Sequence, residues 1–380
     1  MSLVLLLAGS LVFQYPMPLN ATYAPQQTSE TTWELLESSY PDALFRDVKF
    51  INSTYGWIAG EVHVDNRNDI IVLHTRDGGD SWQLQYNDSL QSLTMMDVLD
   101  DRTIWINGYG ALFYSLDAGK TWNESTKSGW FGMSTVKFVN HTYGWTATGN
   151  TLYRTTDGGQ SWQSVLGWNY TDSPRMIEVL SPLNIWAVGF DGIYHSTDGG
   201  ETWAESSHAG GWAISFVSET DGWVIGDNRL AHTTDGVSWD ELIVPMRAPA
   251  FRLRAPYTTD IKFIDEDHGW IVGTEISVMY TPNGGADWYE QSVPSRVSSQ
   301  DLRLMAVDFI DETQGWAVGT GGVIMRTTTG SSLGARLWYG ISDPLFVSIV
   351  GIVAVGIVVS AAGARFLRTR RGEKTSQTLL

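Results

Sequence analysis

The sequence predicts an all-β fold, a seven-bladed β-propeller, followed by one transmembrane helix near the C-terminus. Two recurring motifs predict the propeller. One is a turn of the form S/T-x-D-x-G-x-S/T-W, such as TTDGGQSW at 155–162, and the other is a strand with W-x-x-G, such as GWIVG at 269–273. They alternate with a period of about 40 residues, which is the length of a four-stranded blade.

The tryptophan strands define the blades. Each copy is preceded by an alternating strand and followed by a third strand, the aspartate turn and a fourth strand that opens with Ser/Thr-Trp. The copies of the motif lie at Trp57, Trp105, Trp145, Trp186, Trp223, Trp270 and Trp316. The turns end at Trp82, Trp122, Trp162 and Trp203, and weaker copies end at Trp239, one residue short, and at Trp288.

The two ends of the repeat region complement each other. A last turn begins at Thr327 without a Ser/Thr-Trp strand after it, whereas TTWELL at 31–36 is such a strand without a turn before it. We therefore expect the N-terminal strand to complete blade seven, which leaves no open sheet edge at the junction. The propeller then spans residues 29–333.

The aspartates of the turns are predicted to be structural. Aspartate can accept N–H bonds within a loop, the glycines allow positive φ, and the tryptophan can bury its ring against the neighbouring blade. A metal or phosphate loop is expected once or twice around one pocket, whereas these turns are spread around the ring. Weak calcium binding is the alternative. The residues are Asp77, Asp117, Asp157, Asp198 and Asp235.

Both ends of the chain are apolar. Residues 345–364 are uncharged and mostly apolar, and about 20 such residues in a helix cover roughly 30 Å, one hydrocarbon core. The basic tail at 365–380 predicts a single-pass cell-membrane protein with this tail in the cytoplasm and the propeller outside. Residues 1–24 are predicted to be a signal peptide, with an uncleaved anchor as the alternative, and 334–344 a juxtamembrane linker.

Glycosylation motifs agree with an outside location. Each is Asn-X-Ser/Thr without proline, although such motifs also arise by chance in a chain rich in serine and threonine. They begin at Asn20, Asn52, Asn87, Asn123, Asn140 and Asn169.

Composition excludes several classes of function. The chain has 42 Asp and Glu against 24 Lys and Arg, so binding to a nucleic-acid backbone is not expected. The absence of cysteine removes disulfides, thiolate chemistry and Cys-based zinc sites. His74, His195 and His232 occupy equivalent strand positions in separate blades and cannot converge on a metal. We predict no cofactor and no metal.

The repeats resemble a known motif. The turn is similar to the Asp-box, or BNR repeat, of sialidases, sortilin-type receptors, some glycoside hydrolases and photosystem II assembly and stability factors. Seven units with G-W-x-x-G before each box, over roughly 31–332, most resemble the last group. That resemblance implies a non-enzymatic propeller outside the membrane that holds a membrane-protein precursor, partly through an arginine patch. The C-terminal helix departs from the group, so only an assembly factor-like role carries over.

One face is predicted to bind a protein partner. Loops that join an outer strand to the next inner strand share the face opposite the aspartate turns, and the longest is VPMRAPAFRLRAPYTTD at 244–260. Arginines and aromatics are enriched at binding hot spots. The alternative is a solvated loop whose arginines pair with nearby acids. The candidate residues are Arg247, Phe251, Arg252, Arg254, Tyr257, Arg175, Arg303, Trp130 and Trp212.

A column of charges is predicted to lie near the central channel. Eight residues before each motif tryptophan stand residues whose signs alternate around the ring, except at Ser215. We expect ion pairs between neighbouring blades, which favour specific packing rather than catalysis. The residues are Lys49, Asp97, Lys137, Glu178, Lys262 and Asp308.

Three functions remain open. We expect a binding or assembly scaffold for another membrane or envelope protein. The main rival is a cell-surface glycan-binding or glycoside-hydrolase propeller, which requires carboxylates converging at the axis. A sialidase is not favoured because the chain lacks the Arg-Ile-Pro motif. A surface-layer domain with structural duties only is the third.

Overall fold

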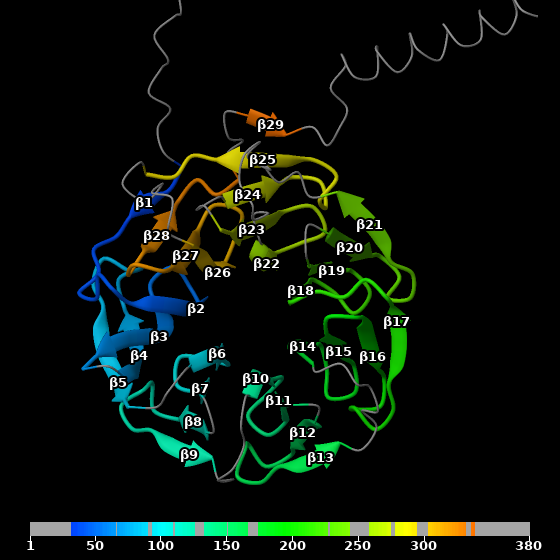
Figure 1. Ribbon diagram of the computed structural model, residues 1–380, viewed down its shortest axis with the longest axis horizontal. Helices are drawn as coiled ribbons and strands as arrows, with labels where there is room; N and C mark the ends of the chain where they lie inside the picture. The colour runs from blue at the N-terminus through cyan, green and yellow to red at the C-terminus, as the bar shows by residue number, and fades with distance from the viewer. Residues whose placement is uncertain are drawn as a thin grey trace, which may run out of the picture. The chain divides into compact units, whose positions relative to one another are not determined.

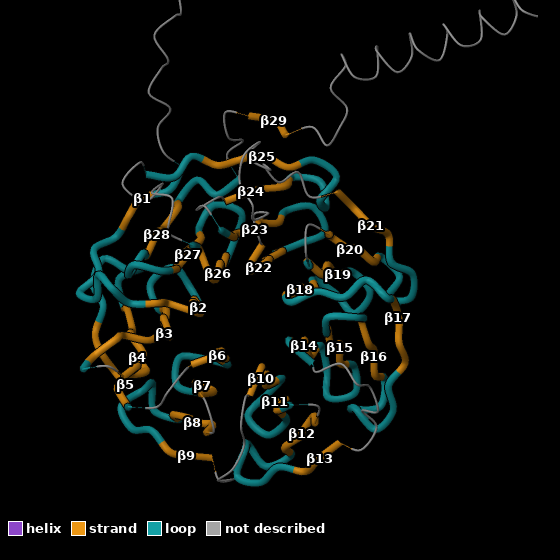
Figure 2. Tube along the Cα trace, in the orientation of Figure 1, coloured by secondary structure: helices purple, strands orange, loops and turns teal. Residues whose placement is uncertain are grey.

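Seven antiparallel sheets stand around a central channel in the computed structural model (Figure 1). The structure describes residues 32–65, 67–89, 93–108, 111–125, 133–149, 151–165, 174–226, 229–243, 258–274, 278–294, 303–331 and 336–338. These residues form strands joined by turns and loops (Figure 2). No helix able to cross a membrane occurs among them. The predicted signal peptide at 1–24 and span at 345–364 lie outside the described residues.

Each blade has its inner strand at the channel. The inner strands are β2 (Leu44–Phe50), β6 (Leu93–Val98), β10 (Met133–Phe138), β14 (Met176–Val179), β18 (Ala213–Phe216), β22 (Thr258–Phe263) and β26 (Leu304–Phe309). The second strands are β3 (Gly56–Val64), β7 (Ile104–Gly108), β11 (Gly144–Thr148), β15 (Ile185–Val188), β19 (Gly222–Ile225), β23 (Gly269–Gly273) and β27 (Gly315–Gly319).

The third and fourth strands complete the blades outward. The third strands are β4 (Arg67–Thr75), β8 (Ala111–Ser115), β12 (Thr151–Thr155), β16 (Ile193–Ser196), β20 (Arg229–Thr233), β24 (Val278–Thr281) and β28 (Ile324–Thr327). The outer strands are β5 (Gln83–Asp88), β9 (Asn123–Ser125), β13 (Gln163–Val165), β17 (Ala204–Ser207), β21 (Asp240–Ile243), β25 (Trp288–Gln291) and β1 (Glu34–Leu35). The prediction of an all-β seven-bladed propeller is confirmed.

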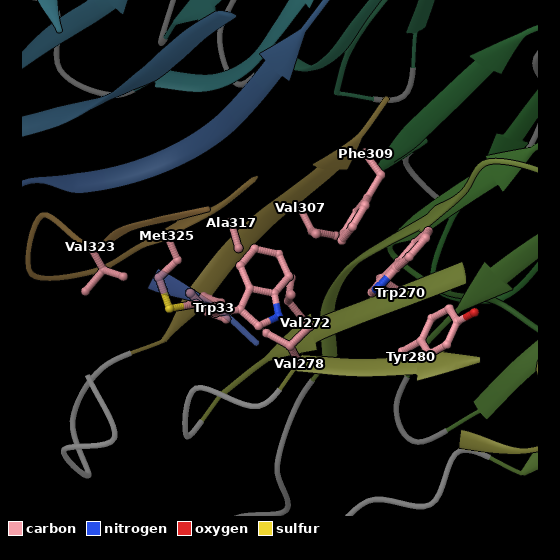
Figure 3. Close-up of a cluster of buried hydrophobic side chains, with 11 residues drawn as sticks. Trp33, Trp270, Val272, Val278, Tyr280, Val307, Phe309, Ala317, Val323 and Met325 are labelled. Atoms are coloured by element: carbon pink, nitrogen blue, oxygen red, sulfur yellow. The ribbon is translucent and has the colours of Figure 1, made fainter. Parts of the chain in front are cut away.

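The N-terminal strand closes the last blade, as predicted. β1 pairs antiparallel with β28, with Glu34 opposite Arg326. Thr327 Oγ1 donates to the carbonyl of Thr32 at 2.6 Å, and Trp33 is buried in a cluster shared by blades six and seven (Figure 3). Both ends of the repeat region are therefore held in one sheet.

Blade six has an additional strand. β29 (Arg336–Trp338) pairs antiparallel with β25, with Glu290 opposite Arg336 and Trp288 opposite Trp338. The sequence analysis assigned these residues to a linker, because three residues after a turn show no strand periodicity. The linker region thus begins as an edge strand.

The motif tryptophans hold neighbouring blades together. Each one lies beneath the inner-strand aromatic of the next blade where that blade has one: Trp316 stacks on Phe50 with centroids 3.5 Å apart, and Trp270 stacks on Phe309 at 3.6 Å (Figure 3). On its other side lies the third-strand residue in register, such as His232 against Trp223 at 4.4 Å. Because these rings are buried, they form a large part of the packing between blades.

The same tryptophans donate hydrogen bonds across the blade boundary. Trp223 Nε1 donates to the carbonyl of Gly284 at 2.9 Å, and Trp316 Nε1 to that of Gly78 at 2.9 Å. Trp186 Nε1 is buried without a partner in the described structure. It faces the aspartate turn of blade five, at 233–239, which is one residue shorter than the others. Trp105 Nε1 is also unpartnered in the described structure, although its turn has full length, and the structure offers no reason.

The aspartate turns are closed by their own side chains. Asp157 Oδ1 accepts from Thr155 Oγ1 at 2.8 Å and from Ser161 N at 2.9 Å, and Oδ2 accepts from Ser161 Oγ. The hydrogen bonds from Ser161 and Thr155 hold the pKa of Asp157 at about 2. Gly158 and Gly159 have φ of 72° and 83°, which favours glycine. The same bonding pattern recurs at Asp77, Asp117 and Asp198.

The glycosylation motifs fall partly within the described residues. Asn52, Asn87 and Asn123 are exposed, and Asn140 is partly buried. Asn52 Oδ1 accepts from Thr54 N and Thr54 Oγ1, both at 2.9 Å, so the motif folds as a local turn. Asn20 and Asn169 lie outside the described residues.

Candidate functional site

The strand order gives the propeller two different faces. In each blade the aspartate turn meets the turn between the first two strands, as where Gly158 N donates to the carbonyl of Thr142 at 2.9 Å. We call this side the turn face. The turns between second and third strands, and the loops that lead into the inner strands, lie at the opposite strand ends, which we call the loop face. Among the described residues, the predicted partner-binding residues Arg175, Trp212 and Arg303 belong to segments of the loop face.

Three of those residues lie in the described structure. Arg175 and Trp212 precede the inner strands of blades four and five, and Arg303 precedes that of blade seven. The other candidates lie outside the described residues; they are Trp130, Arg247, Phe251, Arg252, Arg254 and Tyr257. The structure therefore brings together part of the predicted surface at blades four and five, and places Arg303 at blade seven, two blades beyond blade five.

Arg175 forms a cation–π pair on the loop face. Its Cζ lies 3.2 Å from the ring centroid of Phe190, and 58% of Phe190 is exposed. Phe190 lies in the turn between β15 and β16, which is fixed because Gly211 N donates to the carbonyl of Gly189 at 2.8 Å. Phe190 was not among the predicted residues, since a single aromatic in a short turn has no periodic signal in the sequence.

Trp212 lies in blade five, next to the pair of Arg175 and Phe190 in blade four. Its backbone N donates to the carbonyl of Ile225 at 2.9 Å, and its ring packs with Met176 against the cluster that contains Ala213 and Ile225. The indole Nε1 is buried and has no hydrogen-bond partner among the described residues. A buried N–H without an acceptor is unfavourable, so this position gains from an acceptor supplied by another molecule or segment.

Arg303 is exposed and is held by its backbone. Its N donates to Thr320 Oγ1 at 2.8 Å, and its carbonyl accepts from Thr320 N at 2.9 Å. No residue in the described ranges accepts a hydrogen bond from its guanidinium. This arginine is thus presented to solvent at the entry to blade seven.

The channel contains a second candidate site, a cavity of about 240 Å³. Its wall includes Lys49, Lys137, Glu178, Ser215 and Lys262 from the predicted charge column. Every member of that column lies directly opposite its tryptophan in the sheet register, as Lys137 opposite Trp145. The spacing of eight residues is therefore the geometry of one hairpin.

Ion pairs connect several members of the column. Lys137 Nζ lies 3.7 Å from Asp97 and 3.7 Å from Glu178, which belong to the blades on either side. Lys262 Nζ lies 3.3 Å from Asp308 of the next blade. Lys49 differs, because its ion pair is with Asp47 of its own strand at 3.7 Å.

The carboxylates also bind backbone groups of the next blade. Asp97 Oδ2 accepts from Phe138 N at 2.7 Å, and Asp308 Oδ2 accepts from Phe50 N at 2.8 Å. A second pair of carboxylates does the same. Asp47 and Asp260, each two residues upstream of a lysine of the column, accept from Met96 N and Val307 N respectively, both at 2.9 Å. The sequence analysis missed this second tier because Met, Thr and Ala fill the equivalent positions in other blades.

Burial and charge together set the protonation of this region. Burial opposes the ammonium of Lys49, but the carboxylates of Asp47 and Asp308 outweigh it and raise the pKa of Lys49. Burial raises the pKa of Asp260 to about 6, against the lowering effect of Lys49. Burial likewise raises the pKa of Asp97.

These bonds leave little freedom for acid–base chemistry. Both oxygens of Asp260 accept backbone N–H groups, from Ile261 and Val307. Asp47 does the same with Val48 and Met96. A glycosidase needs one carboxyl group that donates a proton and another that attacks or activates water. Carboxylates fixed to backbone in this way serve packing between blades.

The histidines remain apart, as the ring requires. His74, His195 and His232 each stack on the tryptophan of their own blade. A separate group on the turn face, Asp265, His268 and Glu312, has ligand atoms within 4.8 Å of one another. His268 Nδ1 is already bonded to Asp265 at 2.9 Å and these side chains are solvent-accessible, so the group carries no metal assignment.

Comparison with protein families confirms the resemblance read from the repeats. The family described as photosynthesis system II assembly factor YCF48 matches residues 249–364, and the BNR/Asp-box repeat matches residues 194–205. A comparison with curated protein sequences gave no significant match.

Solved structures share the fold. YCF48 from Cyanidioschyzon merolae is 18% identical, with a TM-score of 0.61 over 78% of this chain and 98% of that one. YCF48 bound to a D1 peptide is 19% identical, with a TM-score of 0.62 over 79% and 96%. An ancestral GH74 enzyme is 12% identical, with a TM-score of 0.56 over 81% and 48%. At these identities the likeness concerns the fold alone.

Proposed function

We propose that this protein is a non-enzymatic scaffold whose loop face holds an extracytoplasmic segment of another membrane protein, in the manner of an assembly factor. The single observation that carries the proposal is the cation–π pair of the half-buried Arg175 with the exposed ring of Phe190. The guanidinium lies over the ring, and the exposed part of Phe190 gives blade four an apolar contact area beside a positive charge.

The chemistry of this pair suits a peptide. An arginine fixed over an aromatic ring offers planar N–H donors beside apolar area, the combination found in binding hot spots. In the neighbouring blade five, the indole N–H of Trp212 has no partner among the described residues and could donate to a backbone carbonyl of the bound peptide. Arg247, Arg252 and Arg254, which lie outside the described residues, belong to this proposal on the evidence of the sequence alone.

The family comparison agrees with a peptide-binding role. One YCF48 structure was solved bound to a D1 peptide. The matched region includes the arginine-rich loop predicted from the sequence. The hydrophobic segment at 345–364 would tether the propeller on the outer side of the membrane, where such a partner is within reach.

The glycoside-hydrolase alternative is weaker. The channel does contain converging carboxylates, which that reading requires. However, Asp47, Asp97, Asp260 and Asp308 each accept at least one backbone N–H, so they are engaged in holding the blades. Likeness to a GH74 enzyme at 12% identity concerns the fold only.

A crosslinking pull-down from native membranes tests the proposal. Full-length protein is compared with Arg175→Ala, Phe190→Ala and the Arg247, Arg252 and Arg254 to Ala triple variant. Arg102→Ala is the matched control, because Arg102 is exposed on the turn face. We expect one dominant membrane-protein partner that is lost from the loop-face variants and kept by the control.

Two results would contradict the scaffold. One is the absence of any protein partner for the wild type, and the other is equal capture by Arg175→Ala, Phe190→Ala and the control. A D1 peptide used as a fluorescent probe addresses the finer question. Its binding would extend the likeness from the family's fold to the family's partner, and its failure with a different partner captured would leave the scaffold in place.

A further inference from the structure

The charge column has one neutral position, and this position has a structural consequence. Seven residues in a closed ring cannot alternate in sign without a break. Ser215 of blade five provides the break, between Glu178 of blade four and Lys262 of blade six. Residues of opposite charge therefore occupy the equivalent positions on either side of a small neutral side chain.

Glu178 is the most accessible acid of the column and Lys262 is its most accessible lysine. The side chain of Glu178 is 23% exposed, against 10% for Asp97 and 5% for Asp308. The side chain of Lys262 is 34% exposed, against 28% for Lys49 and 21% for Lys137. The most accessible acid and the most accessible lysine of the column are thus the two residues on either side of Ser215.

Both residues also keep unused bonding capacity. Glu178 Oε2 lies 3.7 Å from Lys137, while Oε1 has no partner among the described residues. Lys262 has three N–H donors and one described ion-pair partner, Asp308. Ser215 Oγ accepts from Phe263 N at 3.0 Å, which leaves its O–H free to donate.

The cavity beside them is small and has both polar and apolar walls. Glu178, Ser215 and Lys262 line it together with Met176, Ile214 and Phe216. Its volume of about 240 Å³ lies below the range of about 300–1,000 Å³ for drug-sized ligands, so it suits a small molecule. Methionine walls adapt readily to ligands of different shape.

We infer that the channel binds a small zwitterion, an amino acid or a molecule of similar charge pattern, over Ser215. Its ammonium group would bind Glu178 and its carboxylate would bind Lys262 and the hydroxyl of Ser215. Such a ligand completes the alternation that the odd number of blades interrupts. This site is separate from the loop face and does not rest on the proposed function.

Isothermal titration calorimetry with glycine on the full-length protein in detergent tests the inference. Acetate and glycine amide, which each carry one of the two charges, are the comparison probes. We expect glycine to bind at millimolar concentration and each one-charge probe to bind about tenfold more weakly, since each lost ion pair costs about 1.4 kcal/mol.

Three variants locate the site. Glu178→Gln and Lys262→Gln are each expected to weaken glycine binding about tenfold, and Ser215→Leu is expected to abolish it by filling the cavity. Lys49→Gln is the control, because it removes a ring lysine from the opposite side of the same cavity. Circular dichroism and tryptophan fluorescence establish that every variant is folded.

Several outcomes would overturn the inference. No glycine binding by the folded wild type excludes a zwitterion site. Equal affinity for glycine and acetate identifies a plain anion site. Unchanged binding in folded Ser215→Leu, or equal loss in Lys49→Gln, places the ligand elsewhere.

Discussion

Trp33 meets the ring of Phe309 edge-on, with the ring centroids 5.7 Å apart and the planes at 88°. The same relationship occurs within other blades, between Phe50 and Trp82 and between Phe263 and Trp288. Trp33 therefore occupies in blade seven the position that the outer-strand tryptophan occupies elsewhere, although it comes from the other end of the repeat region.

Replacing Trp33 should weaken the whole ring. Trp33→Ala removes a fully buried indole and its Nε1 bond to Gln291, so we expect a loss of about 3 to 5 kcal/mol in the free energy of unfolding. Chemical denaturation followed by tryptophan fluorescence measures it. Trp33→Phe, which keeps a ring, should cost less. Unchanged stability in Trp33→Ala would show that β1 does not close the ring.

Removing one partner of the Asp308–Lys262 ion pair should lower the free energy of unfolding. Asp308→Asn leaves Lys262 without its described partner and alters the acceptor for Phe50 N, and because Lys262 is partly exposed we expect a loss of about 1 to 3 kcal/mol. The double variant Asp308→Asn with Lys262→Met should recover part of this loss, because no unpaired charge remains. Thermal denaturation compares the three proteins. Strictly additive losses would contradict a coupled pair.

Two tryptophans offer a matched test of the hydrogen bond across blades. Trp223 and Trp186 both stack between an aromatic of the next blade and a histidine, but only Trp223 donates to a described carbonyl. Trp223→Phe should therefore destabilise by about 1 kcal/mol more than Trp186→Phe. Urea denaturation gives both values. Equal losses would mean that stacking alone stabilises the boundary.

His74 should make stability depend on pH. Burial lowers the pKa of His74 from 6.5 to about 4. Gln85 Nε2 donates to the carbonyl of Ala118 and to His74 Nδ1, so the ring is neutral with its proton on Nε2. Below pH 6.5 the unfolded chain binds a proton that the folded chain does not. Stability should therefore fall by up to about 3 kcal/mol between pH 6.5 and 4.

Melting temperatures across this pH range measure the effect. His74→Phe should flatten the dependence, whereas His63→Gln should leave it unchanged, because His63 is exposed. An identical slope in His74→Phe and the wild type would show that other groups control the acid response.

Much of the fold could be predicted because the repeat reports on backbone geometry. The spacing of Lys137 and Trp145 is a property of one hairpin, and it recurs in every blade. The closing strand could be found because TTWELL lacks a turn and the turn at Thr327 lacks a strand. Turn and strand chemistry repeated seven times leaves few alternative folds.

The sites were less predictable because they depend on departures from the repeat. Phe190 is a single residue in one turn, and Asp47 and Asp260 have no charged equivalents in the other blades. β29 is too short for a periodic pattern. Trp212 and Arg175 were predicted from their loops, but their neighbours become known only when blades four and five are placed side by side.

The edge strand of blade six changes how the propeller responds to tension. A force applied to the chain beyond Trp338 first reaches the short β29, whose three residue pairs with β25 can separate one after another. The strand that closes the ring is loaded only later, through β28, which is held between β27 and β1. We therefore expect β29 to separate from β25 under tension before β28 is loaded, so that Trp33 stays buried while the chain lengthens.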